Sequence, residues 1–159
     1  MVNKTVYTEE HLVQMLTWMN DPEVFVERFN LDKDYAFVIH TMLFDQYKTI
    51  AIVGSGLKRA LKILEIVKEQ YNLIPEWCRP KTTTFNKREF EVDNGNRILT
   101  GKASGCVLQG TSVNIMLLDT KVLDMTNLDD REFAYESLVF ARDVLKTKII
   151  NVHLNRLES

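Results

Sequence analysis

The sequence predicts an α/β fold in which a mostly parallel central sheet is flanked by helices and carries one inserted β-hairpin. Three strand-sized runs rich in apolar residues, Thr49–Val53, Val113–Leu118 and Ile149–Val152, are separated by segments with apolar residues at helical spacing. Strands that are apolar on both faces are typical of parallel sheets, which helices cover. Asn94-Gly95, between two alternating segments, indicates the hairpin.

The N-terminal third is expected to be helical except for one short strand. Residues 8–19 begin with an acidic first turn and continue with apolar residues at helical spacing, and Pro22 ends this helix. Val24–Val26 is typical of a short strand. Asp34–Tyr47 carries a second apolar stripe at helical spacing and leads directly into the first buried strand.

The rest of the chain is expected to form a helix, several short strands and a second long helix. Apolar spacing predicts a helix over 57–71. Thr82–Phe85 is a candidate strand, and Glu89–Val92 pairs with Arg97–Thr100 across a turn expected to be type I′, whose two central residues need positive φ. An amphipathic pattern predicts a helix over 129–146.

Composition limits the classes of protein and partner. With 159 residues, 45% hydrophobic and 26% charged, the chain is expected to form a single domain over 1–159. Twenty basic against twenty-two acidic residues exclude a global positive field for DNA or an anionic membrane, so nucleic-acid contact would need a local patch. The basic residues of such a patch are Lys58, Arg59, Lys62 and Lys68. No apolar run has the length of a membrane span, and no signal peptide is visible.

Neither a metal site nor a nucleophilic triad is expected. Cys78 and Cys106 lack zinc-site spacing, and the three histidines are scattered along the chain. His40 lies within a predicted amphipathic helix, where a structural role is preferred.

A glycine-containing turn, Gly54-Ser55-Gly56, lies between the first buried strand and the following helix. This placement fits a dinucleotide fingerprint, in which glycines let backbone N–H groups reach a pyrophosphate. Arg59 fills the third glycine position, so a tight turn is the preferred interpretation. Lys58 and Arg59 oppose the dipole of the helix unless an anion or a partner compensates their charge.

Asp119 directly follows an apolar strand, at the edge of a parallel sheet where α/β proteins place ligands. The Mg²⁺-coordinating aspartate of nucleoside triphosphatases has this placement. Such an enzyme also needs a glycine-rich phosphate loop with a lysine and a carboxylate beside the aspartate. The sequence contains no such loop, and Thr120 follows Asp119. On spacing alone, a capping role is therefore preferred to metal binding.

Three motifs follow one another at a characteristic spacing. They are Leu73-Ile-Pro-Glu-Trp77 with Pro80, Phe90-Glu-Val-Asp-Asn-Gly-Asn-Arg-Ile98 and Gly110-Thr-Ser-Val-Asn-Ile-Met-Leu-Leu-Asp119. Together they resemble the ATPase domain of the large terminase subunit, the genome-packaging motor of tailed bacteriophages, especially of the T4-like kind. His11–Met19 is similar to the helix before the Walker A strand of that family, and Thr147–Ile150 to the strand before its coupling motif. The resemblance implies a P-loop NTPase-like fold.

The chain departs from this family at the phosphate-binding loop. Where the family has a glycine- and lysine-rich Walker A loop, this chain has Arg28–Tyr35, which contains no glycine. Lys33 is the only candidate for the Walker A lysine. The phosphate cradle is therefore expected to be absent.

Further departures affect the remaining motifs. The resemblance places Asp119 at the Walker B aspartate, but Thr120 replaces the catalytic glutamate and Gln109 replaces an arginine. Asn151–Asn155 replaces the Thr/Ser-rich coupling motif. The sequence stops at Ser159, so we expect a truncated form without the nuclease domain of the family.

The lost motifs predict a pseudo-ATPase, because hydrolysis needs positioned phosphates, Mg²⁺ and an oriented water together. We expect no cofactor and a non-catalytic interaction protein of a phage or phage satellite, in the cytoplasm of the bacterial host, that modulates or blocks genome packaging. The expected partner is a packaging component: the large terminase, the small terminase or the portal. Lys58, Arg59 and Trp77 are candidate interaction residues, and Lys33, Asp119 and Thr120 are the degenerate nucleotide-binding positions.

Two other classes of function stay open. One is an enzyme, either a weak nucleotide hydrolase that uses an unconventional loop at Asn30–Asp34 or one half of a split terminase ATPase completed by another chain. The other is a nucleic-acid-binding regulator that keeps the DNA contact surface of the motor. The net charge of −2 disfavours DNA as a partner.

Overall fold

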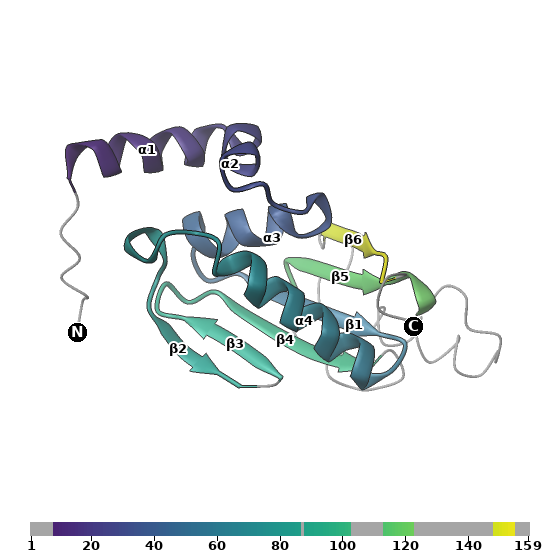
Figure 1. Ribbon diagram of the computed structural model, residues 1–159. Helices are drawn as coiled ribbons and strands as arrows, with labels where there is room; N and C mark the ends of the chain where they lie inside the picture. The colour runs from purple at the N-terminus through teal and green to yellow at the C-terminus, as the bar shows by residue number, and fades with distance from the viewer. Residues whose placement is uncertain (1–7, 87, 103–112, 123–147, 155–159) are drawn as a thin grey trace.

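A six-stranded mixed sheet forms the centre of the molecule (Figure 1). The computed structural model describes residues 8–86, 88–102, 113–122 and 148–154. In spatial order the strands are β2 (Thr82–Phe85), β3 (Glu89–Val92), β4 (Arg97–Lys102), β1 (Thr49–Gly54), β5 (Ile115–Asp119) and β6 (Lys148–Val152). The first three are antiparallel neighbours, and β4, β1, β5 and β6 are parallel. The sheet is therefore mostly parallel with an antiparallel extension at one side.

The parallel half confirms that the three apolar runs are neighbours in one sheet. Ile50 lies opposite Ile115 in the β1–β5 pair, and Met116 lies opposite Ile149 in the β5–β6 pair. Strands β1 and β5 are almost entirely buried, as their apolar sequences predict. Strand β6 is more open, and Ile149 is 47% exposed.

Within the described residues, four α-helices accompany the sheet: α1 (Glu9–Asn20), α2 (Pro22–Phe29), α3 (Lys33–Phe44) and α4 (Leu57–Tyr71). Two short 3₁₀ helices, η1 (Glu76–Cys78) and η2 (Thr120–Val122), follow α4 and β5. The predicted strand at Val24–Val26 is wrong, because these residues lie within α2. Asp21 caps this helix by accepting a hydrogen bond from the N–H of Val24, and Pro22 occupies its first turn.

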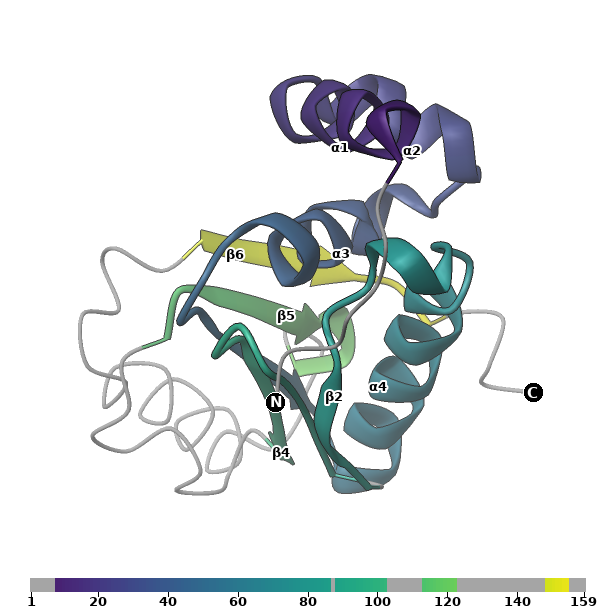
Figure 2. The same ribbon diagram turned by 90° about the vertical axis from the view of Figure 1, so that its left-hand side faces the viewer.

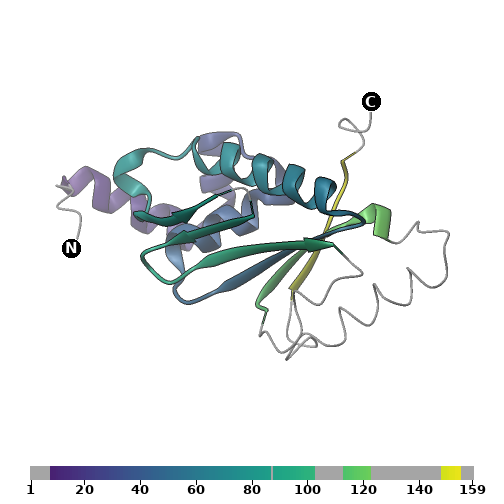
Figure 3. The same cartoon turned by 90° about the horizontal axis from the view of Figure 1, so that it is seen from below.

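Helices α3 and α4 pack on the same face of the sheet (Figure 3). Ile50 and Ile52 of β1 belong to the core cluster on this face, together with Ile115 and Leu117 of β5. Helices α1 and α2 lie beyond α3, on its side away from the sheet (Figure 2), and bring Trp18 and other aromatic residues into the same core. The predicted helix over 129–146 lies outside the described residues. Within the described part of the chain, no helix has the length and apolar character of a membrane span.

The predicted hairpin is confirmed, but its turn is not type I′. The N–H of Gly95 donates to the carbonyl of Val92, and Gly95 has a φ of +87°. Asn94 has no positive φ, so the geometry is that of a type I turn followed by a left-handed glycine.

Asn96 joins this hairpin to the end of α3. The side chain is fully buried, and its Nδ2 donates to the carbonyl oxygens of Thr41, Met42 and Asp45 at 3.1, 3.2 and 2.8 Å. Its Oδ1 accepts from the N–H of Lys48 at 2.8 Å. Because the last carbonyls of a helix have no partner inside the helix, one side chain both terminates α3 and aligns the chain for entry into β1.

Candidate functional site

The candidate site lies where β1 and β5 end side by side. Val53 of β1 lies opposite Leu118 of β5, so the residues that follow these strands meet at one edge of the sheet. Asp119 is the last residue of β5, and Ser55 follows β1. Arg59 is in the first turn of α4. This edge is where parallel sheets place ligands, as the sequence predicts for Asp119.

The carboxylate of Asp119 is fully buried and receives hydrogen bonds at both oxygens. Its Oδ2 accepts from Arg59 Nε at 2.6 Å and from the N–H and Oγ of Ser55, each at 3.2 Å. Its Oδ1 accepts from Arg59 Nη2 at 3.0 Å and from the N–H of Lys121 at 3.1 Å. The guanidinium thus binds the carboxylate in the bidentate geometry that gives the strongest ion pairs.

The surroundings keep Asp119 ionised. Burial alone would raise the pKa of its carboxyl group, but the hydrogen bond from Arg59, the N–H groups of Ser55 and Lys121 and the charge of Arg59 together lower it below its ordinary value. A carboxylate has about four lone-pair positions, and five donors already surround this one. A positive charge such as that of Arg59 is unfavourable at the N-terminus of a helix because of the helix dipole. Asp119 neutralises this charge, which explains how Arg59 is tolerated there.

The turn before α4 depends on the first of its two glycines. A Cβ atom at Gly54 would lie 2.6 Å from the backbone nitrogen of Ala60 and 2.7 Å from the carbonyl oxygen of Gly56. A Cβ atom at Gly56 would have nothing within 4 Å. Gly54 therefore permits the close approach of α4 to β1, which supports the interpretation of this segment as a tight turn.

The segment that the resemblance places at the Walker A position, Arg28–Tyr35, forms the end of α2 and the start of α3. Asn30 ends α2 in the left-handed conformation, with a φ of +50°. The carboxylate of Asp32 accepts from the N–H of Asp34 at 2.9 Å and caps α3. The N-terminus of α3 therefore already holds a carboxylate, where a phosphate-binding helix would hold its ligand.

Lys33 and Asp119 are not brought together by a described contact. Lys33 is the exposed first residue of α3, and no donor to Asp119 within the described residues comes from it. Thr120 begins η2 directly after Asp119 and is partly buried. Of the three predicted nucleotide-binding positions, Asp119 is therefore bound by Arg59, and Thr120 is next to it in the chain. Lys33 lies on a different element, α3.

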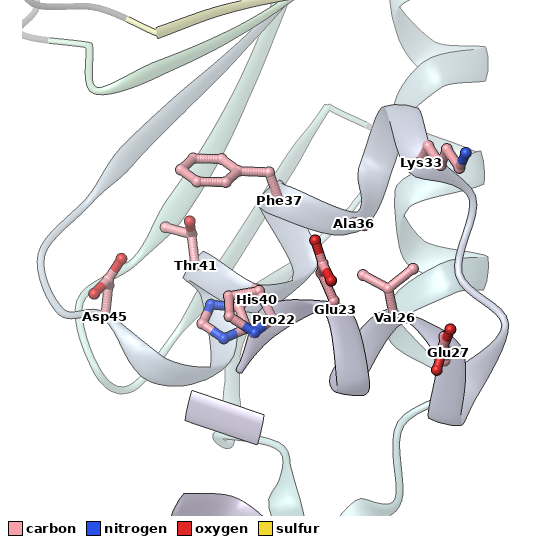
Figure 4. Close-up of a pocket in the computed structure, with 10 residues that line it drawn as sticks. All are labelled: Pro22, Glu23, Val26, Glu27, Lys33, Ala36, Phe37, His40, Thr41 and Asp45. Carbon is pink, nitrogen blue, oxygen red and sulfur yellow. The ribbon is translucent and has the colours of Figure 1, made fainter. Parts of the chain in front are cut away.

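A groove of about 720 Å³ lies between α2 and α3 (Figure 4). Its lining residues are Pro22, Glu23, Val26, Glu27, Lys33, Ala36, Phe37, His40, Thr41 and Asp45. Its lining includes three carboxylates and one lysine, and Pro22, Val26, Ala36 and Phe37 are apolar. Such a groove repels phosphate groups. His40 bonds through Nε2 with the carbonyl of Trp18 at 2.9 Å, in agreement with the predicted structural role.

The predicted interaction residues occupy three different environments. Lys58 is exposed, whereas Arg59 is held by Asp119. The ring of Trp77 is partly buried and stacks on His11, with ring centroids 4.0 Å apart. Of the other residues of the basic patch, Lys62 pairs with Glu65 at 3.6 Å.

Cys78 is the last residue of η1 and is a buried, free thiol. Burial raises the pKa of this thiol to about 11. It is therefore protonated at neutral pH and is no nucleophile. Among the residues that the structure describes, no group of three or more His, Cys, Asp or Glu side chains is arranged to hold a metal ion.

No protein-family model matches the chain. Among solved structures, it is similar to the large terminase from a thermophilic bacteriophage in complex with ADP, with a TM-score of 0.52. The two chains are 12% identical, and the similarity covers 76% of this chain and 29% of the terminase. The fold is therefore terminase-like, as the sequence resemblance predicts, and the chain spans less than a third of that terminase.

Proposed function

We propose that this protein is a non-catalytic, terminase-like interaction protein of a phage or phage satellite, related to the T4-like terminases, that modulates or blocks genome packaging. Its partner is a component of the packaging machinery: the large terminase, the small terminase or the portal. The observation that carries the proposal is the pairing of Asp119 with Arg59.

The ion pair supports a pseudo-ATPase because it occupies the carboxylate that would hold Mg²⁺. A cation at Asp119 would have to displace the guanidinium, whose two bonds measure 2.6 and 3.0 Å. Removing one partner of a buried ion pair costs about 3–5 kcal/mol, so a cation would have to bind Asp119 strongly enough to offset the loss of the guanidinium. The residues present therefore do not fit the metal-bound nucleotide of an active member of this fold.

The N-terminus of α3 gives independent support. Backbone N–H groups at a helix start bind phosphates when they are free and when no negative charge is adjacent. Here Asp32 caps the helix, and Asp34 follows in its first turn. Thr120 supplies no carboxylate to orient a water molecule. A terminase-like fold that cannot bind or hydrolyse a nucleotide still has the outer surfaces of its helices and sheet. A packaging partner can recognise those surfaces.

Calorimetric titration with ATP and Mg²⁺ tests the non-catalytic part of the proposal. We expect no binding at physiological nucleotide concentration and no hydrolysis. Micromolar binding that Asp119→Asn or Lys33→Ala abolishes would contradict the proposal. Lys58→Ala serves as the control, because Lys58 is exposed and lies outside the nucleotide-binding positions.

A split terminase ATPase is the second candidate, favoured by the fold similarity to an ADP-bound terminase of which this chain spans 29%. In that case another chain would complete the site. The same titration, repeated with purified packaging proteins present, distinguishes the two. ATP turnover that appears only in the mixture and requires Asp119 supports the split enzyme.

A further inference from the structure

Helix α1 carries an exposed apolar stripe that is not part of the core formed by the described residues. Met15 and Trp18 face the core, whereas Leu12, Leu16 and Met19 are 49%, 56% and 42% exposed. Val13, beside them, is 63% exposed. Clusters of large exposed apolar side chains on a protein surface mark interaction sites.

The spacing of these residues places them along one side of the helix. Leu12, Leu16 and Met19 are at positions i, i+4 and i+7, which share one face and match the anchors of helix-in-groove recognition. The helix that presents them is well formed: Thr8 and His11 make a reciprocal capping box at its start. It also lies on the outside of the molecule, in the layer farthest from the sheet (Figures 1 and 2).

The charged residues of α1 and of the segment that follows it, up to Glu27, are all acidic. From Thr8 to Glu27 the sequence has no Lys or Arg and five acidic residues. Glu9 and Glu10 lie at the start of α1, and Asp21 and Glu23 lie just beyond its end. These four residues are exposed. The apolar stripe is therefore bounded at both ends by carboxylates.

This charge pattern disfavours a second copy of the chain as the occupant. Two antiparallel α1 helices would place Glu9 and Glu10 against Asp21 and Glu23 of the other copy, and two parallel helices would place each group against itself. Like charges across an interface oppose binding. Residues 129–146 of the same chain contain five acidic and three basic residues, so their charge is not complementary either.

We propose that the stripe formed by Leu12, Val13, Leu16 and Met19 binds an amphipathic helix of another protein, with apolar anchors at helical spacing and Lys or Arg at both ends. This inference rests on the proposed function, because that function makes the partner a packaging component. It adds which surface of this chain binds the partner and which kind of helix is bound. The apolar contacts supply affinity, and the terminal charges fix the position of the bound helix.

Two synthetic peptides test the proposal directly. Each is an amphipathic helix of about 18 residues, long enough to form in water. They share one apolar face and differ only in carrying Lys or Glu at both ends. Fluorescence anisotropy with the full chain should give micromolar affinity for the Lys-ended peptide, about ten-fold or more tighter than for the Glu-ended peptide. Raising the salt concentration should reduce this difference.

Variants of the chain locate the site. Leu12→Gln with Leu16→Gln should weaken binding about ten-fold or more while keeping the helix, because Gln is a good helix former. Leu73→Gln is the matched control, since Leu73 is 50% exposed and lies outside α1. Equal affinity for both peptides, or an equal loss from Leu73→Gln, would overturn the proposal. So would self-association in sedimentation that the double variant removes, because a second copy would then be the occupant.

The same double variant separates this inference from the proposed function. A packaging effect of the wild type that persists in the double variant overturns this surface and leaves the proposed function standing. Selective peptide binding by a protein that leaves packaging unchanged overturns the proposed function and leaves the surface standing.

Discussion

At the scale of single residues, Asp119 and Arg59 define the electrostatics of the sheet edge. Asp119 is fully buried, and the Arg59 side chain is 22% exposed. An arginine is well suited to this position, because its fork of N–H donors matches both carboxylate oxygens. A buried carboxylate that lost this partner would keep the donors of Ser55 and Lys121 but would have no opposite charge beside it.

Arg59→Met should therefore destabilise the protein by about 3–5 kcal/mol at pH 7, because it leaves the Asp119 carboxylate buried and unpaired. Urea unfolding followed by circular dichroism measures this change. Lys58→Met, in the same helical turn but exposed, should change stability by less than about 0.5 kcal/mol. Equal losses of stability from the two substitutions would show that the ion pair contributes no more to stability than an exposed lysine does.

Stability should also depend on pH through Asp119. Its folded pKa is lowered, so its stabilising contribution is complete above the unfolded value of about 3.9 and is lost as pH falls through the folded value. In Arg59→Met, burial without the guanidinium raises this pKa, so lowering the pH relieves the unpaired charge. The stability difference between wild type and Arg59→Met should shrink steadily from pH 7 toward pH 4. A constant difference over this range would contradict the account.

At the opposite end of β1, the buried Asn96 side chain also holds several chain segments together by hydrogen bonds. Asn96→Ala should cost about 2–4 kcal/mol, because the Lys48 N–H and the Asp45 carbonyl lose the buried amide as their partner. Asn20→Ala is a suitable control, since Asn20 is exposed and makes one hydrogen bond to the carbonyl of Leu16. We expect it to cost less than about 1 kcal/mol in the same unfolding experiment.

At the scale of elements, the turn between β1 and α4 determines how closely the helix approaches the sheet. Gly54→Ala should destabilise the protein by more than about 2 kcal/mol, because its Cβ would meet the backbone of Ala60 and Gly56. Gly56→Ala should cost less than about 1 kcal/mol, since its Cβ has free space and only the N-cap preference changes. Thermal unfolding of the two variants makes the comparison, and a larger loss for Gly56→Ala would disprove this role of Gly54.

The strands and α4 could be predicted from sequence because their apolar spacing is strong and local. The β-branched and aromatic residues of Val24–Val26 favour a strand locally, but the Asp21 cap and Pro22 start a helix there. At the site, Asp119 was recognisable from its place after an apolar strand. Its partner was not, because pairing Arg59 with Asp119 requires knowing that β1 and β5 are adjacent. The unfavourable charge of Arg59 at a helix start was the available signal.

At the scale of the whole molecule, the terminase-like sheet and the outer layer of α1 and α2 have separate roles in the proposed function. At the sheet edge, Arg59 pairs with the Asp119 carboxylate. In the outer layer, α1 presents an exposed apolar stripe between carboxylates. We propose that a protein arranged in this way acts through binding. Its effect should therefore be insensitive to changes at Asp119 that preserve folding.

The most direct test is the number of packaged genomes per capsid in infected cells that express the wild type, Asp119→Asn or the Leu12→Gln, Leu16→Gln double variant. Folding of each variant is first verified by circular dichroism. We expect the wild type and Asp119→Asn to change packaging equally and the double variant to lose the effect, with recovery of terminase or portal in pull-downs following the same order. An unchanged genome count with the wild type, or an effect that only Asp119→Asn abolishes, would contradict a non-catalytic binding function.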